Sequence, residues 1–410
     1  MAAAASDPQP TRHQIVIIGG GNAGISLAAR LRRYGAKGIA VVEPSSRHLY
    51  QPLFSHIAGG TAEASEAIRP QASVIPRGVT WVRDAVVDID AGQNTIHLAS
   101  GDQIRYDQLV VCPGIQKDWD AVPGLADAMA SKYGASNYEI ELAPKAWELL
   151  RNLRRGTVVF NLPPGPLTCG GAAQKPMYLA CDYWAQQGVL EDIRVMLIVP
   201  TPTVFAEAVA NEELNRKIAE YGIEVRHNSE ITAVDAVERT VSVQDLGAGS
   251  GVGGSETLTY DVLHAVPPQS APDWLKATDL SKPGDPAGFV EVDPETLRSI
   301  RYPAVWSLGD AAATLNSKSG AALRQQTQVV AKNLMAVLKG KSLNAKYNNY
   351  SACPFTVSRS TVVFSEFDDQ YRAKPSIPWK GIMREHRATF VLERRILPWV
   401  YWNLILKGRA

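Results

Sequence analysis

The most restrictive feature of the sequence lies near its N-terminus, where an apolar run is followed by a glycine-rich turn and then by a helical pattern. Residues 15–18 are all β-branched, and glycines follow at positions 19, 21 and 24. This G-x-G-x-x-G spacing joins a strand to a helix N-terminus that can receive a pyrophosphate group. The sequence therefore predicts a dinucleotide-binding turn made of Gly19, Gly21, Asn22, Ala23 and Gly24.

The three glycines have separate tasks, and a carboxylate follows them at the expected distance. Gly19 allows the tight turn, Gly21 lets a phosphate approach the backbone, and Gly24 lets the helix pack close to the strand. A second expected strand, residues 38–42, is followed by Glu43, about 20 residues beyond the motif. A carboxylate there accepts hydrogen bonds from a ribose 2′-hydroxyl and repels a 2′-phosphate. The alternative is a glycine-rich turn in some other α/β sheet, but strand, helix, second strand and acid together favour the dinucleotide site.

A second α/β unit is predicted further along the chain, from about residue 137. Its first strand leads into a loop where Pro163, Pro164 and Pro166 remove backbone N–H groups that a phosphate would need. Its second strand is followed by Pro200 rather than by an acid. This unit has the shape of an NAD-binding module without the chemistry of one. The expected fold class is α/β, with two Rossmann-like dinucleotide-binding domains, and 410 residues are ample for both and a short appendage.

After the second unit, the first domain is expected to resume. A predicted strand ends in Gly309 and Asp310, where a carboxylate is placed to accept a hydrogen bond from a ribityl or ribose hydroxyl. The alternative is an ordinary aspartate at a helix N-cap. Beside the glycine-rich turn, Glu43 and the Pro-Gly turn that contains Gly114, the same aspartate favours FAD as the cofactor.

These features divide the chain into five predicted segments. They are a disordered N-terminus (1–13), the first part of the FAD-binding domain (14–136), a degenerate second Rossmann-like domain (137–285), the second part of the FAD-binding domain (286–345) and a C-terminal quinone and membrane-interface segment (346–410). Short strands between residues 79 and 111 are expected to form a β-meander. The glycine-rich residues 247–254 are interpreted as a hairpin loop.

Residues 390–410 combine aromatic and aliphatic side chains with flanking cations. This composition suits a helix in the headgroup region of a membrane, and the alternative is a helix docked on the core or on a partner subunit. No run of about 18 apolar residues predicts a membrane-spanning helix. Residues 1–10 resemble neither a signal peptide nor a convincing transit peptide. The expected location is therefore peripheral, or monotopic, on the cytoplasmic face of the cell membrane rather than on the mitochondrial inner membrane.

The charge and the cysteines exclude several classes of function. A net charge of +1 argues against binding to nucleic acid. The four cysteines include no C-x-x-C pair, so no metal site is predicted. Cys112 and Cys181 are interpreted as a strand-end thiol and a thiol on a helix flank. Cys169 is expected about one turn ahead of a helix that starts near Pro176, where the helix dipole and Lys175 favour a thiolate.

Across nearly its whole length, the sequence resembles the sulfide:quinone oxidoreductases, particularly their mitochondrial-like branch. The matching motifs are Val42-Glu43-Pro44 with Tyr50-Gln51-Pro52, Gly114-Ile115-Gln116, residues 169–175 with Met177-Tyr178-Leu179, Gly309-Asp310, Ser317-Lys318 and Ser351-Ala352-Cys353-Pro354. The resemblance adds Gln51, Gly114 and Lys318 to the expected cofactor site. It also implies that Cys169 and Cys353 are the two active cysteines.

The resemblance implies an FAD enzyme that oxidises hydrogen sulfide, carries sulfane sulfur on the cysteine pair and passes two electrons to a membrane quinone, either ubiquinone or menaquinone. Sulfide would attack a disulfide or polysulfide bridge and leave a persulfide on Cys353, and the freed Cys169 thiolate would reduce FAD at its C4a position. Sulfite, glutathione, cyanide or a second sulfide would then remove the sulfur. A homo-oligomer is left open.

Two other functions share this architecture. A single-subunit NADH:quinone oxidoreductase is the first, and the proline-filled loop after residue 161 argues against it. A flavin-binding, membrane-associated protein without catalytic activity is the second. Reduction of the flavin by sulfide, by NADH or by neither distinguishes the three.

Overall fold

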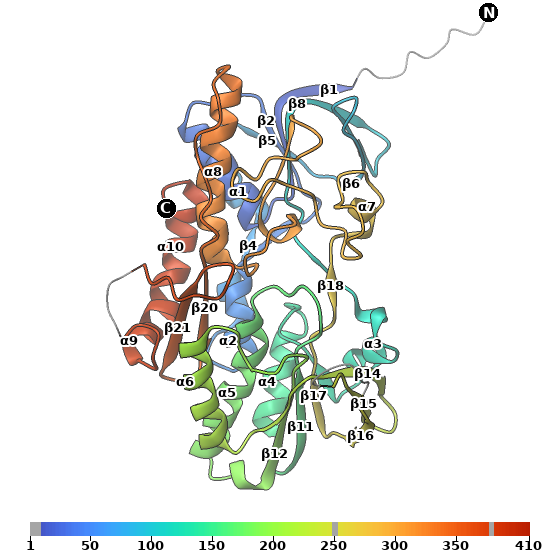
Figure 1. Ribbon diagram of the computed structural model, residues 1–410, viewed down its shortest axis with the longest axis vertical. Coiled ribbons are helices and arrows are strands. Elements are labelled where there is room, and N and C mark those ends of the chain that lie inside the picture. The colour runs from blue at the N-terminus through green and yellow to red at the C-terminus, as the bar shows by residue number, and fades with distance from the viewer. Residues whose placement is uncertain (1–9, 248–252, 377–380) are drawn as a thin grey trace, which may run out of the picture.

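The computed structural model of the chain describes residues 10–247, 253–376 and 381–410. Figure 1 shows two lobes, each built around a sheet, with the C-terminal part of the chain along one side of both. The first lobe contains the N-terminal strand and the second lobe contains the middle of the chain.

The first sheet forms around the expected N-terminal strand. β1 (Thr11–Ile18) pairs in parallel with β2 (Ile39–Val42) on one side and with β8 (Gln103–Val111) on the other. β5 (Val79–Val82) extends the sheet beyond β2, and β19 (Val305–Ser307) pairs with the last residues of β8. Because all these pairings are parallel, the carboxyl ends of the strands meet at one edge, where open α/β sheets bind their ligands.

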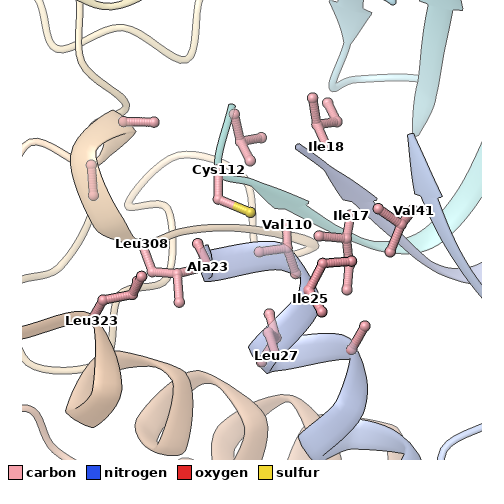
Figure 2. Packing of buried hydrophobic residues seen from close by; sticks show 14 of the residues in the cluster. Ile17, Ile18, Ala23, Ile25, Leu27, Val41, Val110, Cys112, Leu308 and Leu323 are labelled. Carbon is pink, nitrogen blue, oxygen red and sulfur yellow. The ribbon is translucent and has the colours of Figure 1, made fainter. Parts of the chain in front are cut away.

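The core of the first lobe lies between this sheet and the helix that follows the glycine-rich turn. Side chains of α1 (Asn22–Arg33), such as Ile25, point toward strand residues that include Ile17 and Val110 (Figure 2), and all three are fully buried. α8 (Gly320–Leu338) packs against α1. Burying each of these large side chains contributes roughly 1.5–3 kcal/mol.

The β-meander expected between residues 79 and 111 is only partly correct. β6 (Val86–Asp90), β7 (Thr95–Leu98) and β8 form an antiparallel ladder, but β5 pairs in parallel with β2. Residues 43–78 separate β2 from β5, and a connection of this length permits the crossover that parallel pairing requires. β8 therefore serves two ladders, because its first residues pair with β7 and its last residues pair with β19.

The second lobe contains a parallel sheet and a smaller antiparallel sheet. The order of the parallel sheet is β10 (Gly134–Ala135), β17 (Val262–His264), β11 (Gly156–Asn161), β12 (Ile193–Ile198) and β13 (Glu224–Arg226). Its helices include α4 (Ala143–Asn152), α5 (Gly170–Gln186) and α6 (Ala208–Tyr221), which Figure 1 shows in the lower lobe. This is the second Rossmann-like sheet that the sequence predicts.

The limits of the second lobe differ from the expected residues 137 and 285. β10 belongs to the second sheet although it precedes residue 137. β9 (Gln116–Lys117) and β18 (Gln269–Ser270) pair where the chain passes between the lobes, and α7 (Asp273–Lys276) contacts β6 of the first lobe. The two crossing strands therefore mark the boundary, and the sequence contains no composition change at them.

Two further expectations concern ends and loops. β1 begins at Thr11, so residues 11–13 belong to a strand and the expectation of disorder there is wrong; residues 1–9 lie outside the described residues. β15 (Thr240–Asp245) and β16 (Ser255–Thr259) pair antiparallel, which confirms the hairpin around the glycine-rich loop, while residues 248–252 of that loop lie outside the described residues.

The chain ends in a short ladder and a helical segment. β20 (Ser351–Thr356) pairs antiparallel with β21 (Val362–Phe367). Residues 387–410, called the terminal segment below, form α9 (Arg387–Val391), a π-helical turn (Leu392–Ile396), α10 (Leu397–Asn403) and a 3-10 turn (Ile405–Lys407). The 3-10 turn of this segment contacts α1, so the end of the terminal segment lies against the first lobe (Figure 1).

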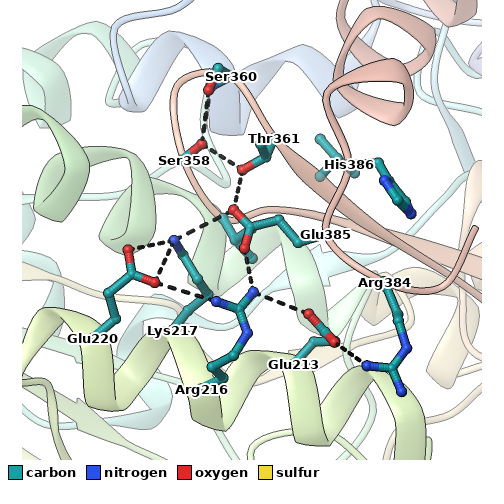
Figure 3. A network of polar contacts seen from close by, with 12 residues as sticks. Glu213, Arg216, Lys217, Glu220, Ser358, Ser360, Thr361, Arg384, Glu385 and His386 are labelled. Atoms are coloured by element: carbon teal, nitrogen blue, oxygen red, sulfur yellow. Dashed lines mark hydrogen bonds and ion pairs between the residues drawn. The ribbon is translucent and has the colours of Figure 1, made fainter. Parts of the chain in front are cut away.

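A polar network attaches the second lobe to the residues just before the terminal segment (Figure 3). Glu385 pairs with Arg216 and with Lys217, both from α6, and accepts a hydrogen bond from Thr361 at 2.6 Å. Arg384 pairs with Glu213 of the same helix at 3.2 Å. Exposed ion pairs contribute little individually, about 0–1 kcal/mol, but this group shares one half-buried carboxylate and so fixes the position of the segment that follows.

Candidate active site

The glycine-rich turn has the geometry of a phosphate cradle. Gly19 has a φ of +101°, a conformation that side chains rarely adopt, and a Cβ on Gly24 would lie 1.9 Å from the carbonyl oxygen of Gly19. A Cβ on Gly21 would meet nothing within 4 Å, so the space in front of the turn is open. Gly21 caps α1 without a side-chain hydrogen bond, and the first turn contains no acid. The amide groups of this helix end thus suit a pyrophosphate.

Glu43 stands at the end of β2, where the sequence places it. Its Oε2 accepts a hydrogen bond from the amide of Gly20 at 2.7 Å, and its Oε1 accepts one from the amide of Ser45 at 2.8 Å. These bonds hold the carboxylate next to the glycine-rich turn. Each carboxylate oxygen has two lone pairs, so one on each remains for a ribose hydroxyl.

The strand end at residue 309 lies beside the first turn of α1. A Cβ on Gly309 would lie 3.7 Å from Cβ of Ala23, and Leu308 and Ala23 appear side by side in Figure 2. Asp310 follows in a 3-10 turn, and burial raises the pKa of its carboxyl. Lys318 reaches back to this turn, because its Nζ donates to the carbonyl oxygens of Asp310 and Ala312 at 2.7 and 2.8 Å. Burial lowers the pKa of Lys318 to about 8.

The remaining predicted cofactor residues are less closely tied to the cradle. Gly114 has a φ of +87° and open space around its Cβ position, as expected for a turn that a ligand approaches. The side chain of Asn22 accepts a hydrogen bond from Ser26 at 3.0 Å, so it faces along α1. Gln51 lies exposed at the start of a 3-10 turn (Gln51–Leu53), and its role stays a prediction.

The fold brings together the two cysteines that the sequence separates by 184 positions. The Sγ atoms of Cys169 and Cys353 lie 3.1 Å apart, and both residues are free thiols. A disulfide bond is about 2.05 Å long, so a shift of about 1 Å would join them. Cys353 is fully buried within β20, and its Sγ accepts a hydrogen bond from the amide of Gly171 at 3.3 Å.

Cys169 caps α5 directly, which corrects the helix start that the sequence suggested near Pro176. The helix begins at Gly170 and contains Pro176 in its interior. A proline there has no N–H for the carbonyl of Ala172, four residues earlier. Ser55 and Asn137 replace that donor, since their side chains donate to the Ala172 oxygen at 3.1 and 2.9 Å. Distant residues thus permit a proline inside this helix.

The backbone of Cys169 is held in an uncommon conformation. Its φ is +45°, in the left-handed region that favours glycine, at a cost on the order of 1–3 kcal/mol. Its amide donates to the carbonyl of Lys318 at 2.9 Å, and the hydroxyl of Tyr138 donates to the carbonyls of Thr168 and Cys169 at 2.8 and 3.3 Å. The bond to Lys318, whose ammonium group donates to the carbonyl of Asp310, connects the cysteine to the Asp310 end of the predicted cofactor site.

The two thiols have opposite acidities. A hydrogen bond from the Cys353 thiol lowers the pKa of Cys169 to about 7; burial opposes this effect and the charge of Lys175 supports it. The same hydrogen bond, together with burial, raises the pKa of Cys353 well above its usual value. In the reduced pair Cys169 is therefore the thiolate, and Cys353 is the thiol that donates to it.

A cluster of buried charged residues lies near Cys169, and the sequence analysis identified only one of them, Lys175. Lys175 Nζ donates to Oε1 of Glu393 at 2.5 Å, and Thr356 donates to Oε2 at 2.6 Å. Nε2 of His56 lies 3.5 Å from the same carboxylate. Burial lowers the pKa of His56, which keeps its ring neutral in spite of Glu393. Glu393 comes from the π-helical turn. Its partner Lys175 lies 218 positions away in the sequence, and no local sequence pattern predicts that the two residues pair.

The N-terminus of α5 bears on the prediction that the second lobe lacks the phosphate site of an NAD-binding module. In a dinucleotide-binding unit this helix end would face a pyrophosphate. Here the amide of Gly171 instead donates to the sulfur of Cys353, and the amide of Cys169 donates to the carbonyl oxygen of Lys318. The helix dipole therefore acts on the cysteine pair.

Comparison with known proteins identifies the family. The pyridine nucleotide-disulphide oxidoreductase profile matches residues 13–333. A mouse protein named sulfide:quinone oxidoreductase, mitochondrial, is 32% identical and spans 97% of this chain and 87% of its own length. A protein of the same name from Dictyostelium discoideum is 33% identical and spans 97% of this chain and 86% of its own length. The chain belongs to the sulfide:quinone oxidoreductases.

A solved structure confirms the fold of this oxidoreductase. The sulfide:quinone oxidoreductase of Aquifex aeolicus superposes with a TM-score of 0.80 at 19% sequence identity, over 97% of this chain and 92% of that chain. The expected α/β fold with two dinucleotide-binding domains is thereby confirmed, and members of the family are flavoproteins. Across the described ranges, no helix of the oxidoreductase is both long and apolar enough to cross a membrane.

Alkylation of the reduced oxidoreductase should reveal the acidity of Cys169. We expect its rate of reaction with iodoacetamide to rise with pH to a midpoint near 7 and then level off, because the thiolate is the nucleophile and the Cys353 thiol stabilises it. Peptide mass spectrometry would follow Cys169 directly. In Lys175→Gln the midpoint should move upward, since the cation is lost. A midpoint close to ~8.5 in the wild type, the ordinary value for cysteine, would contradict the assignment.

Proposed function

We propose that the chain is an FAD-dependent sulfide:quinone oxidoreductase in which Cys169 and Cys353 are the catalytic residues. The observation that carries the proposal is the 3.1 Å separation of the two sulfur atoms at the N-terminus of α5, next to the turn that holds Asp310 and Lys318. Relatives at 32–33% identity named sulfide:quinone oxidoreductase support the same activity. Residues 19–24, Glu43 and Gly309 would hold FAD, and the flavin ring of that cofactor would supply the two-electron acceptor.

The cysteine pair divides the chemistry between a sulfur carrier and an electron donor. Hydrosulfide attacks the Cys353 sulfur of a Cys169–Cys353 disulfide; a new sulfur–sulfur bond forms on Cys353, and the Cys169 thiolate leaves with the electron pair of the broken bond. The lowered pKa of Cys169 makes it the better leaving group. An acceptor nucleophile then removes the sulfane sulfur from Cys353. Re-forming the disulfide releases two electrons from the cysteine pair, and a bound flavin next to Cys169 would supply the two-electron acceptor that quinone reoxidises.

One experiment separates this function from its alternatives. The purified yellow protein is mixed with sulfide or with NADH without oxygen, and the flavin absorbance is followed. We expect bleaching by sulfide and none by NADH, because the cysteine sulfur occupies the helix end that an NAD pyrophosphate would need. Bleaching by NADH alone would favour an NADH:quinone oxidoreductase, and bleaching by neither would favour a binding protein.

The cofactor is expected to be non-covalent FAD. The cradle fits a dinucleotide, because α1 begins with free amides and Glu43 faces the ribose position. Precipitation of the holoenzyme with acid should release the flavin to the supernatant, where chromatography identifies it. Flavin that stays in the pellet, or FMN in the extract, would contradict this proposal.

The terminal segment is proposed to contact a membrane and the quinone. Val391, Ile396 and Trp399 are exposed by 51%, 46% and 58%, so one side of the segment presents apolar groups to solvent. Its other side is docked, since Tyr401 and Trp402 are buried in the protein. The sequence alternatives of a membrane helix and a docked helix thus describe two sides of one segment.

Arg394 is a cation of the terminal segment that does not face solvent. It is buried, donates to the carbonyl of Thr61 at 2.7 Å and pairs with Glu66. The cytoplasmic face of a cell membrane stays a prediction, and the word mitochondrial in the names of the mouse and Dictyostelium relatives weighs against it. The identity of the quinone, the sulfur acceptor and a homo-oligomeric state stay proposals as well.

Serine at the three exposed apolar positions should release the protein from lipid. Burial of each such side chain is worth roughly 1.5–3 kcal/mol, so Val391→Ser/Ile396→Ser/Trp399→Ser should lower vesicle partitioning by at least about tenfold. Co-sedimentation with liposomes measures it. Val237→Ser, exposed on the second lobe, is the matched control and should partition as the wild type does. Equal partitioning of the triple variant would rule out this surface. Truncation is a poorer test, because it also removes the buried residues Tyr401 and Trp402.

A further inference from the structure

A side chain of the terminal segment reaches the glycine-rich turn. The hydroxyl of Tyr401 in α10 lies 2.6 Å from Nε2 of His48, and Nδ1 of His48 lies 3.1 Å from the carbonyl oxygen of Gly20. Gly20 stands between Gly19 and Gly21 in the phosphate cradle. Tyr401 and His48 are each only 2% exposed. Two buried hydrogen bonds therefore link the last helix of the chain to the first turn.

The chemistry of the end groups fixes the direction of both hydrogen bonds. A carbonyl oxygen only accepts, so the proton of the His48 ring lies on Nδ1, which donates to Gly20. Burial lowers the pKa of His48 and keeps the ring neutral, so Nε2 carries no proton. The Tyr401 hydroxyl must then donate to Nε2. Removal of that hydroxyl would leave a buried acceptor without a donor, which is unfavourable.

Other polar groups hold the same residue, Gly20, through both of its peptide groups and leave it little freedom. Nε2 of Gln71 donates to the Gly20 carbonyl at 2.9 Å, and Glu43 accepts from the Gly20 amide at 2.7 Å. A Cβ on Gly20 would lie 2.5 Å from the Gln71 nitrogen. Because the peptide is held by this set of bonds, a change in one of them alters the aim of the neighbouring amides that face the phosphates.

The terminal segment also contacts the other end of α1. The Arg30 guanidinium donates to the oxygen of Ala410, and a Cβ on Gly408 would lie 2.6 Å from the amide nitrogen of Arg30. Between these points, the Trp402 ring lies 4.1 Å from the guanidinium carbon of Arg69. The segment thus follows α1 from the phosphate-facing turn to its last turn.

We infer that Tyr401 is a positioning residue for FAD, and that FAD binding and docking of the terminal segment stabilise each other. The inference rests on the proposed binding of FAD to residues 19–24. Coupling between two binding events is reciprocal, so whatever the docked segment adds to FAD affinity, FAD adds to the docking of the segment. The exposed apolar side of that segment is thereby coupled to the flavin site.

Titration of the flavin-free protein with FAD tests the first half of the inference. We expect Tyr401→Phe to weaken FAD binding by about tenfold, because the ring is kept and only the donor to His48 is lost. Thr389→Val is the matched control: it also deletes one buried hydroxyl of the terminal segment, which donates to the carbonyls of Val362 and His386 rather than toward the turn. Its FAD affinity should stay within about twofold of wild type.

Thermal unfolding separates positioning from a loss of general stability. A structural role alone would lower the melting temperatures of Tyr401→Phe with and without FAD by the same amount, as expected for Thr389→Val. Positioning instead reduces the rise in melting temperature that FAD produces. Equal FAD affinity in Tyr401→Phe and wild type would overturn the inference and leave the proposed function intact. A wild-type chain that takes up no FAD would overturn both.

The second half of the inference, that FAD stabilises the docking of the terminal segment, can be tested on the wild-type protein. Lys407 and Arg395 are exposed cations of the terminal segment, and Arg155 is an exposed cation of the second lobe. We expect FAD to slow tryptic cleavage after Lys407 and Arg395 more strongly than cleavage after Arg155, as peptide mass spectrometry would measure. Equal protection at all three sites would show that FAD stabilises the molecule as a whole and would contradict the coupling.

Discussion

Cys169→Ser and Cys353→Ser should each lower the rate of flavin reduction by sulfide by roughly 10³–10⁶-fold, the range found when a catalytic nucleophile is removed. A serine in either place cannot form the sulfur–sulfur bond that hydrosulfide attacks. The long-wavelength thiolate-to-flavin absorption should also vanish in Cys169→Ser, since Cys169 is the thiolate of the pair. Anaerobic stopped-flow mixing with sulfide measures both effects, and FAD should remain bound.

The other two cysteines provide matched controls for the same measurement. Burial raises the pKa of Cys112 and of Cys181, so neither thiol supplies a thiolate near neutral pH. Cys112→Ser and Cys181→Ser should keep most of the activity and lose about 1 kcal/mol of stability. Near-normal reduction in either member of the Cys169 and Cys353 pair, or its loss in a folded Cys181→Ser, would show that the pair is assigned wrongly.

Glu393→Ala should destabilise the protein by about 3–5 kcal/mol, because it leaves the buried ammonium of Lys175 without its partner. Lys175 is only 2% exposed, and Glu393 also accepts a hydrogen bond from Thr356. Urea unfolding at neutral pH measures the change in the free energy of unfolding. The double variant Lys175→Met/Glu393→Leu removes both charges and should recover much of the loss.

The pH dependence of the destabilisation caused by Glu393→Ala provides a further check. Burial alone would raise the pKa of Glu393, but the charge of Lys175 outweighs burial and lowers it. A carboxyl with a lowered pKa stabilises the fold fully above its unfolded value of about 4.3, and the stabilisation disappears as the pH falls. The difference between wild type and Glu393→Ala should therefore be largest at neutral pH and shrink in acid. If the free energies of unfolding of wild type and Glu393→Ala differ by less than about 1 kcal/mol at pH 7, the ion pair contributes little to stability, which would contradict this prediction.

The sequence predicts those features that local geometry requires. Gly19 must adopt a positive φ and Gly24 must approach a carbonyl at 1.9 Å from its Cβ position, so no other residue type serves at either place. The acid at the end of the second strand follows from the same local motif, and Glu43 lies where it should. The cysteines were paired by family resemblance, because nothing within either segment shows that the other lies 3.1 Å away.

What the sequence did not predict depends on contacts between distant segments. Proline at a first helical position is a sound local rule, yet α5 begins six residues before Pro176 because Ser55 and Asn137 satisfy the carbonyl that the proline leaves free. The composition of the terminal segment indicated a membrane surface, but it did not reveal that Glu393 is buried. The bond between His48 and Tyr401 spans 353 positions, and each residue alone looks like an ordinary aromatic.

The late position of β19 in the chain has a consequence for biosynthesis. Residues 109–111 of β8 pair with residues 305–307. One edge of the first sheet therefore stays unpaired until a strand almost 200 residues later in the chain has been synthesised. At translation rates of about 5–20 residues per second, that edge stays open for about 10–40 s. An open edge is a template for wrong pairing with another nascent chain. The second lobe is synthesised entirely within this interval, and Tyr401, which supports the flavin turn, is synthesised later still.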